Sequence, residues 1–151
     1  MNDFKALCDR VRETAYAIHV YHGHGHLEKV YENALAHRLR KAGIDVKQQY
    51  PLAVYDEDGT VIGEYVADLL VDDCLIVELK ACRAIASEHI AQILGYLRAS
   101  RIDDGLLINF GSYKFEIKKY IQGHNRTQGT QGMRDTLAIL FFALFAFFCG
   151  Y

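Results

Sequence analysis

Two apolar runs separated by a pair of aspartates constrain the fold of this chain more than any other feature. Residues 63–71 and 74–80 have the length and composition of β-strands, and the pair at 72–73 is short enough for a hairpin turn. A hairpin pairs its two strands in antiparallel fashion, so Asp68 on the first run is expected across from Glu78 on the second. The sequence therefore predicts two strands that bring carboxylates together.

The second run ends in an unexpected charged pair. In the sequence Glu78-Leu79-Lys80, the alternation of a strand places Glu78 and Lys80 on one face and Leu79 on the other. Two carboxylates from paired strands suit Mg²⁺, which takes oxygen ligands and keeps waters that substrate phosphates can replace. An ammonium beside them can orient an attacking water or offset charge on a phosphorane-like transition state. The pattern favours phosphodiester chemistry.

A second interpretation of the same residues is a solvated hairpin edge. Asp and Glu are common at such edges, and Lys there discourages aggregation. Short patterns such as an Asp followed by Glu-x-Lys also recur by chance. The choice between the two interpretations therefore depends on the segments that flank the hairpin.

The downstream flank reads as an amphipathic helix. Residues 87–98 carry apolar side chains at helical spacing, and Ser87 is a candidate N-cap. Within this helix Gln92 and Tyr96 are four residues apart, which places them side by side on the helix surface.

The upstream flank opens a second amphipathic helix close to Gly25, and Gly43 is its expected stop. Glu28 and Tyr31 lie on the same face of this helix. Its predicted buried side consists of Leu27, Val30, Tyr31, Leu35 and Leu39.

Together these segments resemble the GxxExxY protein family over roughly residues 10–122. The pattern that names the family stands here as Gly25, Glu28 and Tyr31. That family is similar to the PD-(D/E)xK nuclease superfamily, in particular to its exonuclease branch with a Gln-x-x-x-Tyr helix, which corresponds to Gln92 and Tyr96. The other matching stretches are residues 65–71, 76–81 and 105–111.

The resemblance implies a metal-dependent nuclease that hydrolyses phosphodiester bonds in DNA or RNA, and we expect DNA ahead of RNA. Its cofactor would be Mg²⁺ or Mn²⁺. The residues that it assigns to the site are the metal ligands Asp68 and Glu78, the catalytic Lys80, the accessory acid Glu28, and Gln92 and Tyr96 on the nucleic-acid side.

The chain departs from the superfamily pattern at two positions. Ala67 replaces the proline that names the superfamily, and His19 stands where an acidic residue of the first helix is expected. Members of such superfamilies can lose catalysis while keeping the fold. The alternative function is therefore a catalytically inactive nucleic-acid-binding or protein-binding module that retains the nuclease fold.

The remaining segments complete an α/β fold. The other predicted elements are a helix over residues 3–21 and strands over 46–55, 60–71, 105–110 and 113–118, with Gly59 in the first turn. The order is two helices, three strands, one helix and two strands. It matches a restriction-endonuclease-like αβββαβ core, a mixed sheet flanked by helices, with an extra N-terminal helix.

Composition excludes a protein that clings to nucleic acid by bulk charge. The chain of 151 residues fits one domain, and its formal net charge of −2 lacks the basic excess of such binders. Contacts with nucleic acid must then be local or mediated by metal. Two groups are candidates for phosphate contact or simply solvated faces, namely Lys114, Lys118, Lys119 and Arg126, and His37, Arg38, Arg40 and Lys41.

The cysteines and histidines raise the question of two other metal centres, an iron–sulfur cluster and a zinc site. Cysteines at positions 8, 74, 82 and 149 form no Cys-x-x-Cys pair, which fits a reducing cytoplasm and excludes the iron–sulfur cluster of some superfamily members. His22, His24 and His26 are an alternative zinc site. No cysteine or carboxylate completes a tetrahedral set at typical spacing, so a polar glycine-rich turn is the competing interpretation.

Three regions are expected along the chain: a nuclease-like domain at residues 1–122, a Gly/Gln/Thr linker at 123–136 and an apolar segment at 137–151. A helix of that segment would span only ~20 Å against the ~30 Å core of a bilayer, so no full membrane span is expected. It could instead cover its own domain, form a homodimer contact or attach weakly to a membrane, and we expect packing against protein. The charged N-terminus lacks a signal sequence, which favours a cytoplasmic location.

Overall fold

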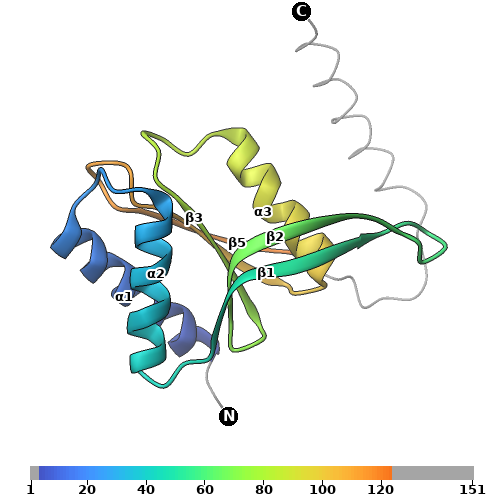
Figure 1. Cartoon of the computed structure of the whole chain (residues 1–151), viewed down its shortest axis with the longest axis horizontal. Coiled ribbons are helices and arrows are strands. Elements are labelled where there is room, and N and C mark those ends of the chain that lie inside the picture. Colours follow the sequence, from blue (N-terminus) through green and yellow to red (C-terminus); the bar gives the residue numbers. More distant parts are fainter. Residues whose placement is uncertain (1–3, 124–151) are drawn as a thin grey trace, which may run out of the picture.

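The structure, a computed structural model, describes residues 4–123 and arranges them in three layers (Figure 1). Helices α1 (Phe4–His22) and α2 (Glu28–Lys41) cover one face of a sheet, and α3 (Ser87–Ser100) packs against the other face. The strands are β1 (Val46–Tyr55), β2 (Val61–Val71), β3 (Leu75–Lys80), β4 (Asp104–Asn109) and β5 (Glu116–Ile121).

The five strands lie in the sheet in the order of the sequence, β1-β2-β3-β4-β5. All neighbours are antiparallel except β3 and β4, which are parallel and joined through α3. This mixed sheet, with an αβββαβ core after an extra N-terminal helix, confirms the predicted α/β fold. The parallel pair matters for function because ligands in α/β sheets bind at the carboxyl ends of such strands.

The predicted β2–β3 hairpin is present. Asp72 and Asp73 have φ angles of 47° and 55°, and the N–H of Cys74 donates to the carbonyl of Val71 over 3.1 Å. Two positive φ angles at the centre of a turn define type I′, in which aspartate is a favoured residue. The ladder pairs residues 69–71 with 75–77, and one further step of this register places Asp68 opposite Glu78.

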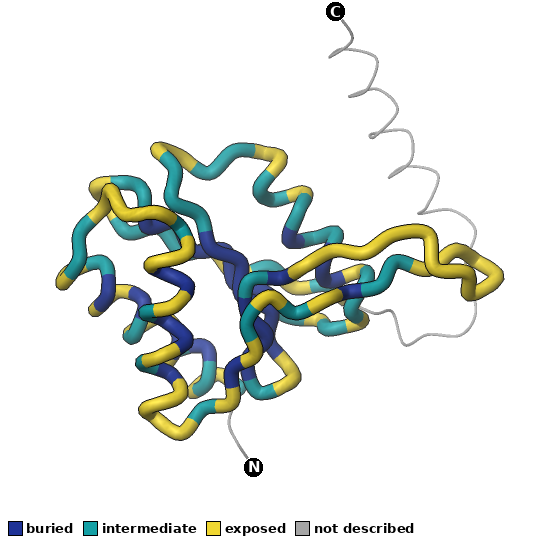
Figure 2. Tube along the Cα trace, viewed as in Figure 1, coloured by how far each residue is buried: buried dark blue, intermediate teal, exposed yellow. Residues whose placement is uncertain are grey.

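Side chains along β3 alternate between the two faces of the sheet. Leu75, Val77 and Leu79 pack in the apolar cluster beneath α1 and α2, whereas Ile76 packs with residues of α3. Figure 2 shows this strand among the most buried parts of the molecule. By the same alternation, Glu78 and Lys80 project towards the face that α3 covers.

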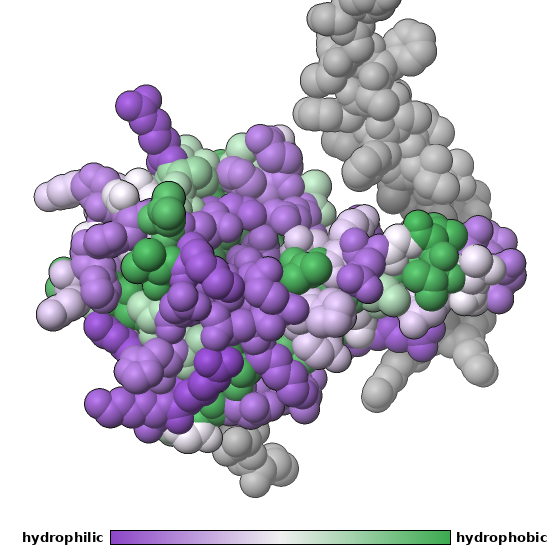
Figure 3. Space-filling view, viewed as in Figure 1, coloured by the Kyte–Doolittle hydropathy of each residue, from purple (hydrophilic) through white to green (hydrophobic). Residues whose placement is uncertain are grey.

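The β1–β2 hairpin extends past the body of the domain as a two-stranded arm (Figures 1 and 2). Its turn ends at Gly59, as the sequence predicts, and the φ of 85° at this residue is a left-handed conformation that glycine adopts readily. Tyr55, Val61 and Ile62 are exposed near this end, where Figure 3 shows an apolar patch. Asp68 lies near the opposite, buried end of this hairpin, next to Glu78 of β3.

Two predicted element starts are wrong. The N-cap of α3 is Ala86, so Ser87 is already helical, and the Nδ1 atom of His89 accepts the N–H of Ala86 over 3.0 Å. Strand β5 begins at Glu116 and not at residue 113, because the connection after β4 is held away from the sheet. The Nε2 atom of His19 in α1 donates to the carbonyl of Ser112 over 2.9 Å.

The predicted buried face of α2 is only partly correct. Tyr31, Leu35 and Leu39 are fully buried, but Leu27 is 79% exposed and Val30 is 41% exposed. Leu27 precedes the helix as its N-cap, so helical spacing does not apply to it.

The stop of α2 is as predicted. Gly43 has a φ of 81°, and the N–H of Ile44 reaches back to the carbonyl of Leu39 over 3.1 Å, which closes the helix end.

The linker, the apolar segment at 137–151 and the homodimer contact expected through it lie outside the described residues. Over residues 4–123, no helix combines the length and apolarity that a membrane crossing requires.

Candidate functional site

Glu78 is the most constrained residue of the site. Its side chain is 3% exposed, and its Oε1 atom accepts the ammonium of Lys80 over 2.9 Å. Its Oε2 atom is buried and has no hydrogen-bond partner among the described residues. Burial and then the charge of Asp68 raise the pKa of Glu78 to about 7, although Lys80 opposes them. An unsatisfied buried carboxylate oxygen is costly, and it indicates a place for a cation.

Asp68 lies beside Glu78, as the hairpin predicts. One oxygen, Oδ2, accepts the N–H of Leu79 over 2.8 Å, and Oδ1 lies 3.4 Å from the side-chain nitrogen of Gln49. Burial raises the pKa of Asp68; the N–H of Leu79 lowers it, while the charges of Glu28 and Glu32 raise it. The two strand carboxylates therefore repel each other in a partly dry environment, which a divalent cation would relieve.

Lys80 is a largely buried cation that forms an ion pair with Glu78. Its side chain is 12% exposed. Burial alone would lower the pKa of Lys80, but the charge and hydrogen bond of Glu78 outweigh it, together with Glu28 and Asp68, and the net shift is upward. Lys80 is therefore a positive charge at neutral pH and not a base.

Gln92 and Tyr96 lie together on α3, as the sequence predicts. The side-chain N–H of Gln92 donates to the hydroxyl of Tyr96 over 2.7 Å. Burial raises the pKa of Tyr96, and the negative charge of Glu78 raises it further. The Tyr96 hydroxyl therefore stays protonated near the carboxylates and can donate a hydrogen bond.

Helix α2 contributes two carboxylates, of which the sequence reasoning found one. Glu28 forms no hydrogen bond or ion pair with the described residues, but its charge acts on Asp68 and Lys80. Glu32, one turn later and 3% exposed, was missed. Its Oε1 atom accepts Lys29 over 2.7 Å and Gln48 over 2.9 Å, and its Oε2 atom accepts Gln49 over 2.8 Å. The four-residue spacing from Glu28 was the available signal.

A second feature that the sequence reasoning missed fixes the chain just beyond Lys80. The side chain of Asn109 is fully buried; its oxygen accepts the N–H of Cys82 over 3.1 Å, and its nitrogen donates to the carbonyl of Cys82 over 2.9 Å. A Cβ atom on Gly111 would lie 2.2 Å from the main-chain nitrogen of Cys82. The β4 terminus therefore requires glycine there and holds the exit of β3 in place.

The histidine-rich turn between α1 and α2 is organised by Tyr31. The Tyr31 hydroxyl donates to the carbonyl of Gly23 over 2.7 Å and accepts the N–H of His26 over 3.2 Å. Its ring stacks on Phe110 with centroids 4.6 Å apart. Tyr31 is thus a structural anchor for the helix that carries Glu28.

The zinc interpretation of this turn is not supported. His24 packs edge-on to Tyr113, and His22 packs edge-on to His26. Within residues 4–123, no three or more His, Cys, Asp or Glu side chains form a group that could hold a metal ion. Asp68 and Glu78 would therefore need oxygens from water or substrate to complete a coordination sphere, which is the usual habit of Mg²⁺.

Some residues of the two basic groups make contacts within the domain. Lys119 pairs with Asp104 over 2.9 Å and lies over the ring of Phe4. The guanidinium of Arg40 donates to the carbonyl of Val46 over 2.7 Å and to Gln48 over 2.9 Å. Lys114, Lys118 and Lys41 remain exposed. Arg126 lies outside the described residues.

Comparisons with known proteins identify the superfamily and the fold of this chain. The family model described as "PD-(D/E)XK nuclease superfamily" matches residues 5–120. A solved structure titled "Crystal structure of SSO0001" is similar in fold, with a TM-score of 0.52 and 14% identity, over 64% of this chain. The match spans 50% of that protein, so the chain corresponds to about half of its length. No curated protein matches the sequence significantly.

Proposed function

The chain belongs to the PD-(D/E)XK nuclease superfamily, and we propose that it is a metal-dependent nuclease that hydrolyses phosphodiester bonds of nucleic acid, DNA ahead of RNA. The observation that carries the proposal is the Oε2 atom of Glu78, which has no hydrogen-bond partner among residues 4–123 and lies next to the Asp68 carboxylate. Such a pair, costly without a cation, is suited to one. The proposed catalytic unit is the domain at residues 1–122.

Asp68 and Glu78 would hold Mg²⁺ or Mn²⁺ in this proposal. The bound ion would supply a Lewis acid for the phosphoryl oxygens and a lowered pKa for a bound water. Asp68 keeps its orientation through the N–H of Leu79, and Glu78 keeps its own through Lys80. The carboxylates therefore enter the reaction already oriented.

Lys80 would act as a charge and hydrogen-bond donor. Because the pKa of Lys80 is raised, its ammonium stays protonated and does not accept a proton from water. It can orient the attacking water and offset the negative charge that develops on phosphorus-bound oxygens.

The helices on either side of the sheet would serve the substrate. Tyr96 accepts a hydrogen bond from Gln92, so its own O–H remains available for a phosphate oxygen or a water. Glu28, which forms no direct bond with the described residues, would accept hydrogen bonds from waters of the metal. In this proposal Gln92 and Tyr96 would contact the substrate, and Glu28 would contact the waters of the metal.

The competing candidate is an inactive nucleic-acid-binding or protein-binding module with the same fold. The buried oxygen of Glu78, which lacks a partner in the described part of the chain, argues against it, because loss of catalysis would leave this energetic cost without a benefit. A site that binds no metal would favour the inactive module.

The test is a cleavage assay on pooled single-stranded and double-stranded DNA and RNA with Mn²⁺, comparing wild type and Glu78→Gln. We expect cleavage by wild type and a loss of at least about 10³-fold in the variant, with a thermal unfolding midpoint that is not lowered. Glu64→Gln is the matched control, because Glu64 is an exposed glutamate of β2 that pairs with Ala53 of β1, away from the site. Equal cleavage by wild type and Glu78→Gln would contradict the proposal.

A further inference from the structure

The β1–β2 ladder is interrupted at one position, opposite Asp68. Gln48 pairs with Leu69 and Tyr50 pairs with Ala67, so the register is the same on both sides, but Gln49 and Asp68 between them do not pair. Gln49 has a φ of +50°, a left-handed conformation that a side chain such as glutamine rarely adopts in a strand. Strain of this kind persists where surrounding contacts require it.

The strained backbone directs two consecutive side chains to one carboxylate. In a regular strand, neighbouring side chains point to opposite faces. Here the Gln48 amide nitrogen lies 2.9 Å from Oε1 of Glu32, and the Gln49 amide nitrogen lies 2.8 Å from Oε2. The buried Glu32 therefore anchors the Gln49 amide in a fixed place.

From that place the second N–H of Gln49 faces Asp68, with its nitrogen 3.4 Å from Oδ1. The other oxygen, Oδ2, is already fixed by the N–H of Leu79. A carboxylate oxygen accepts in two directions, so one donor on each oxygen fixes the plane of the group and leaves the remaining directions for a cation.

We propose that Gln49 is a positioning residue, which couples the buried Glu32 to Asp68 and sets the orientation of Asp68 for the metal ion. This inference rests on the proposed metal-dependent function. Gln48 makes the same kind of bond to Glu32 and none to Asp68, so the two neighbours separate the effect of positioning from the effect of supporting Glu32.

The experiment compares Gln49→Met with Gln48→Met by Mn²⁺ calorimetry and thermal unfolding of the full chain. Methionine keeps the side-chain length and removes the amide donors. Gln49→Gly is the second variant, because glycine adopts the positive φ without strain and keeps the chain path if methionine is not tolerated.

We expect both Gln49 variants to weaken Mn²⁺ binding roughly 10-fold or more, as partners of metal ligands generally do, and Gln48→Met to bind nearly as wild type. Wild-type affinity in the Gln49 variants would overturn the inference and leave the proposed function intact. Equal weakening in Gln48→Met would also overturn it, because the effect would then arise through Glu32. If wild type binds no Mn²⁺, the proposed function fails, and this inference fails with it.

Discussion

The β2–β3 hairpin carries carboxylates at both of its ends, and the two ends differ in burial, in the pKa values of their carboxyl groups and in hydrogen bonding. At the strand end, Asp68 and Glu78 are buried or half-buried, their pKa values are raised, and one oxygen has no partner among the described residues. At the turn end, the Asp73 side chain is 65% exposed and pairs with Lys47. Asp72 accepts the N–H of Asp45 over 3.0 Å.

The comparison shows what distinguishes a site from a solvated edge. The turn-end aspartates have a local role, since they adopt the positive φ angles of the turn and their charges meet water or lysine. The strand-end pair has no such role, because burial next to a like charge opposes the fold. The solvated-edge interpretation of the sequence therefore describes the turn end and not the strand end.

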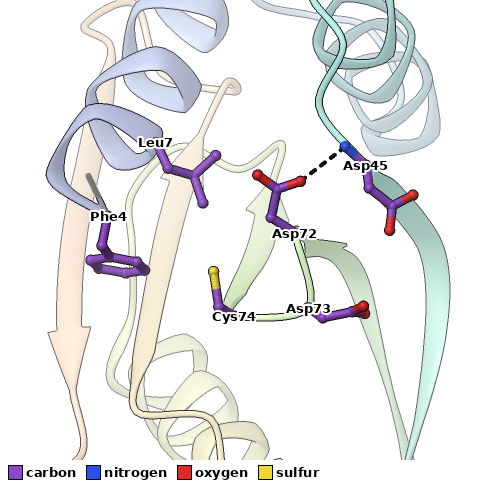
Figure 4. A pocket seen from close by; sticks show the side chains of 6 residues that line it. All are labelled: Phe4, Leu7, Asp45, Asp72, Asp73 and Cys74. Carbon is purple, nitrogen blue, oxygen red and sulfur yellow. Dashed lines mark hydrogen bonds between the residues drawn. The ribbon is translucent and has the colours of Figure 1, made fainter. Parts of the chain in front are cut away.

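The turn end of the hairpin also lines a cavity. A cavity of about 590 Å³ lies beside the turn and is lined by Phe4, Leu7, Asp45, Asp72, Asp73 and Cys74. Figure 4 shows Asp72 bonded to the main chain of Asp45 there. Asp72 and Asp73 in this cavity have hydrogen-bond or ion-pair partners, whereas Oε2 of Glu78 has none among the described residues.

The sharpest contrast between the ends concerns their lysines. Lys80→Met should slow cleavage about a thousandfold, or about 4 kcal/mol of barrier, because the buried charge that offsets the transition state is lost. Single-turnover kinetics at saturating Mn²⁺ would measure it, and calorimetry should find that the metal still binds.

Lys47→Met is the matched control at the turn end, where Lys47 is 44% exposed. Its cleavage rate should equal that of wild type. A similar loss of rate in both variants would mean that the two ends do not differ in function.

The second contrast concerns pH in metal-free buffer. Glu78 has a pKa raised from 4.5 to about 7 in the folded protein. The folded state therefore holds this proton more tightly than the unfolded state, and the free energy of unfolding falls as pH rises from about 4.5 to about 7. The loss amounts to about 3 kcal/mol and is complete above the folded pKa.

Urea unfolding of wild type and Glu78→Gln between about pH 5 and pH 8 measures this dependence. The difference between the two proteins should change in that window, because the glutamine of the variant cannot titrate. Parallel curves would contradict the assignment of a buried, proton-binding carboxylate at the strand end.

The smallest effect is expected at the turn. Asp73→Asn removes an exposed ion pair, so it should change the free energy of unfolding by less than about 1 kcal/mol. Asparagine also accepts the positive φ angle of this position. A larger change on urea unfolding would mean that the turn-end carboxylates contribute more than turn chemistry.

The sequence predicts most of the fold because its signals are local. The Asp72-Asp73 turn, the Gly43 helix stop and the alternation around Glu78 each depend on neighbouring residues, and each is present in the structure. The start of β5 was missed because it depends on His19, which holds Ser112 from 93 positions away.

The candidate site is only partly predictable from the sequence. The arrangement of Asp68, Glu78 and Lys80 follows from strand pairing and alternation. The four-residue spacing from Glu28 could have indicated Glu32, but the contact of Glu32 with Gln49 could not be predicted, because it joins a helix to a strand whose regular alternation is broken at Gln49. No repeating pattern of apolar and polar residues in the sequence indicates this break in the alternation of β1.

The central claim is that the strand-end carboxylates bind a divalent metal ion and the turn-end carboxylates do not. Mn²⁺ calorimetry on wild type, Asp68→Asn and Asp73→Asn tests it most directly. We predict one site in wild type, unchanged affinity in Asp73→Asn, and loss of binding in Asp68→Asn. Absence of binding in wild type at millimolar Mn²⁺, or equal binding by all three proteins, would contradict it.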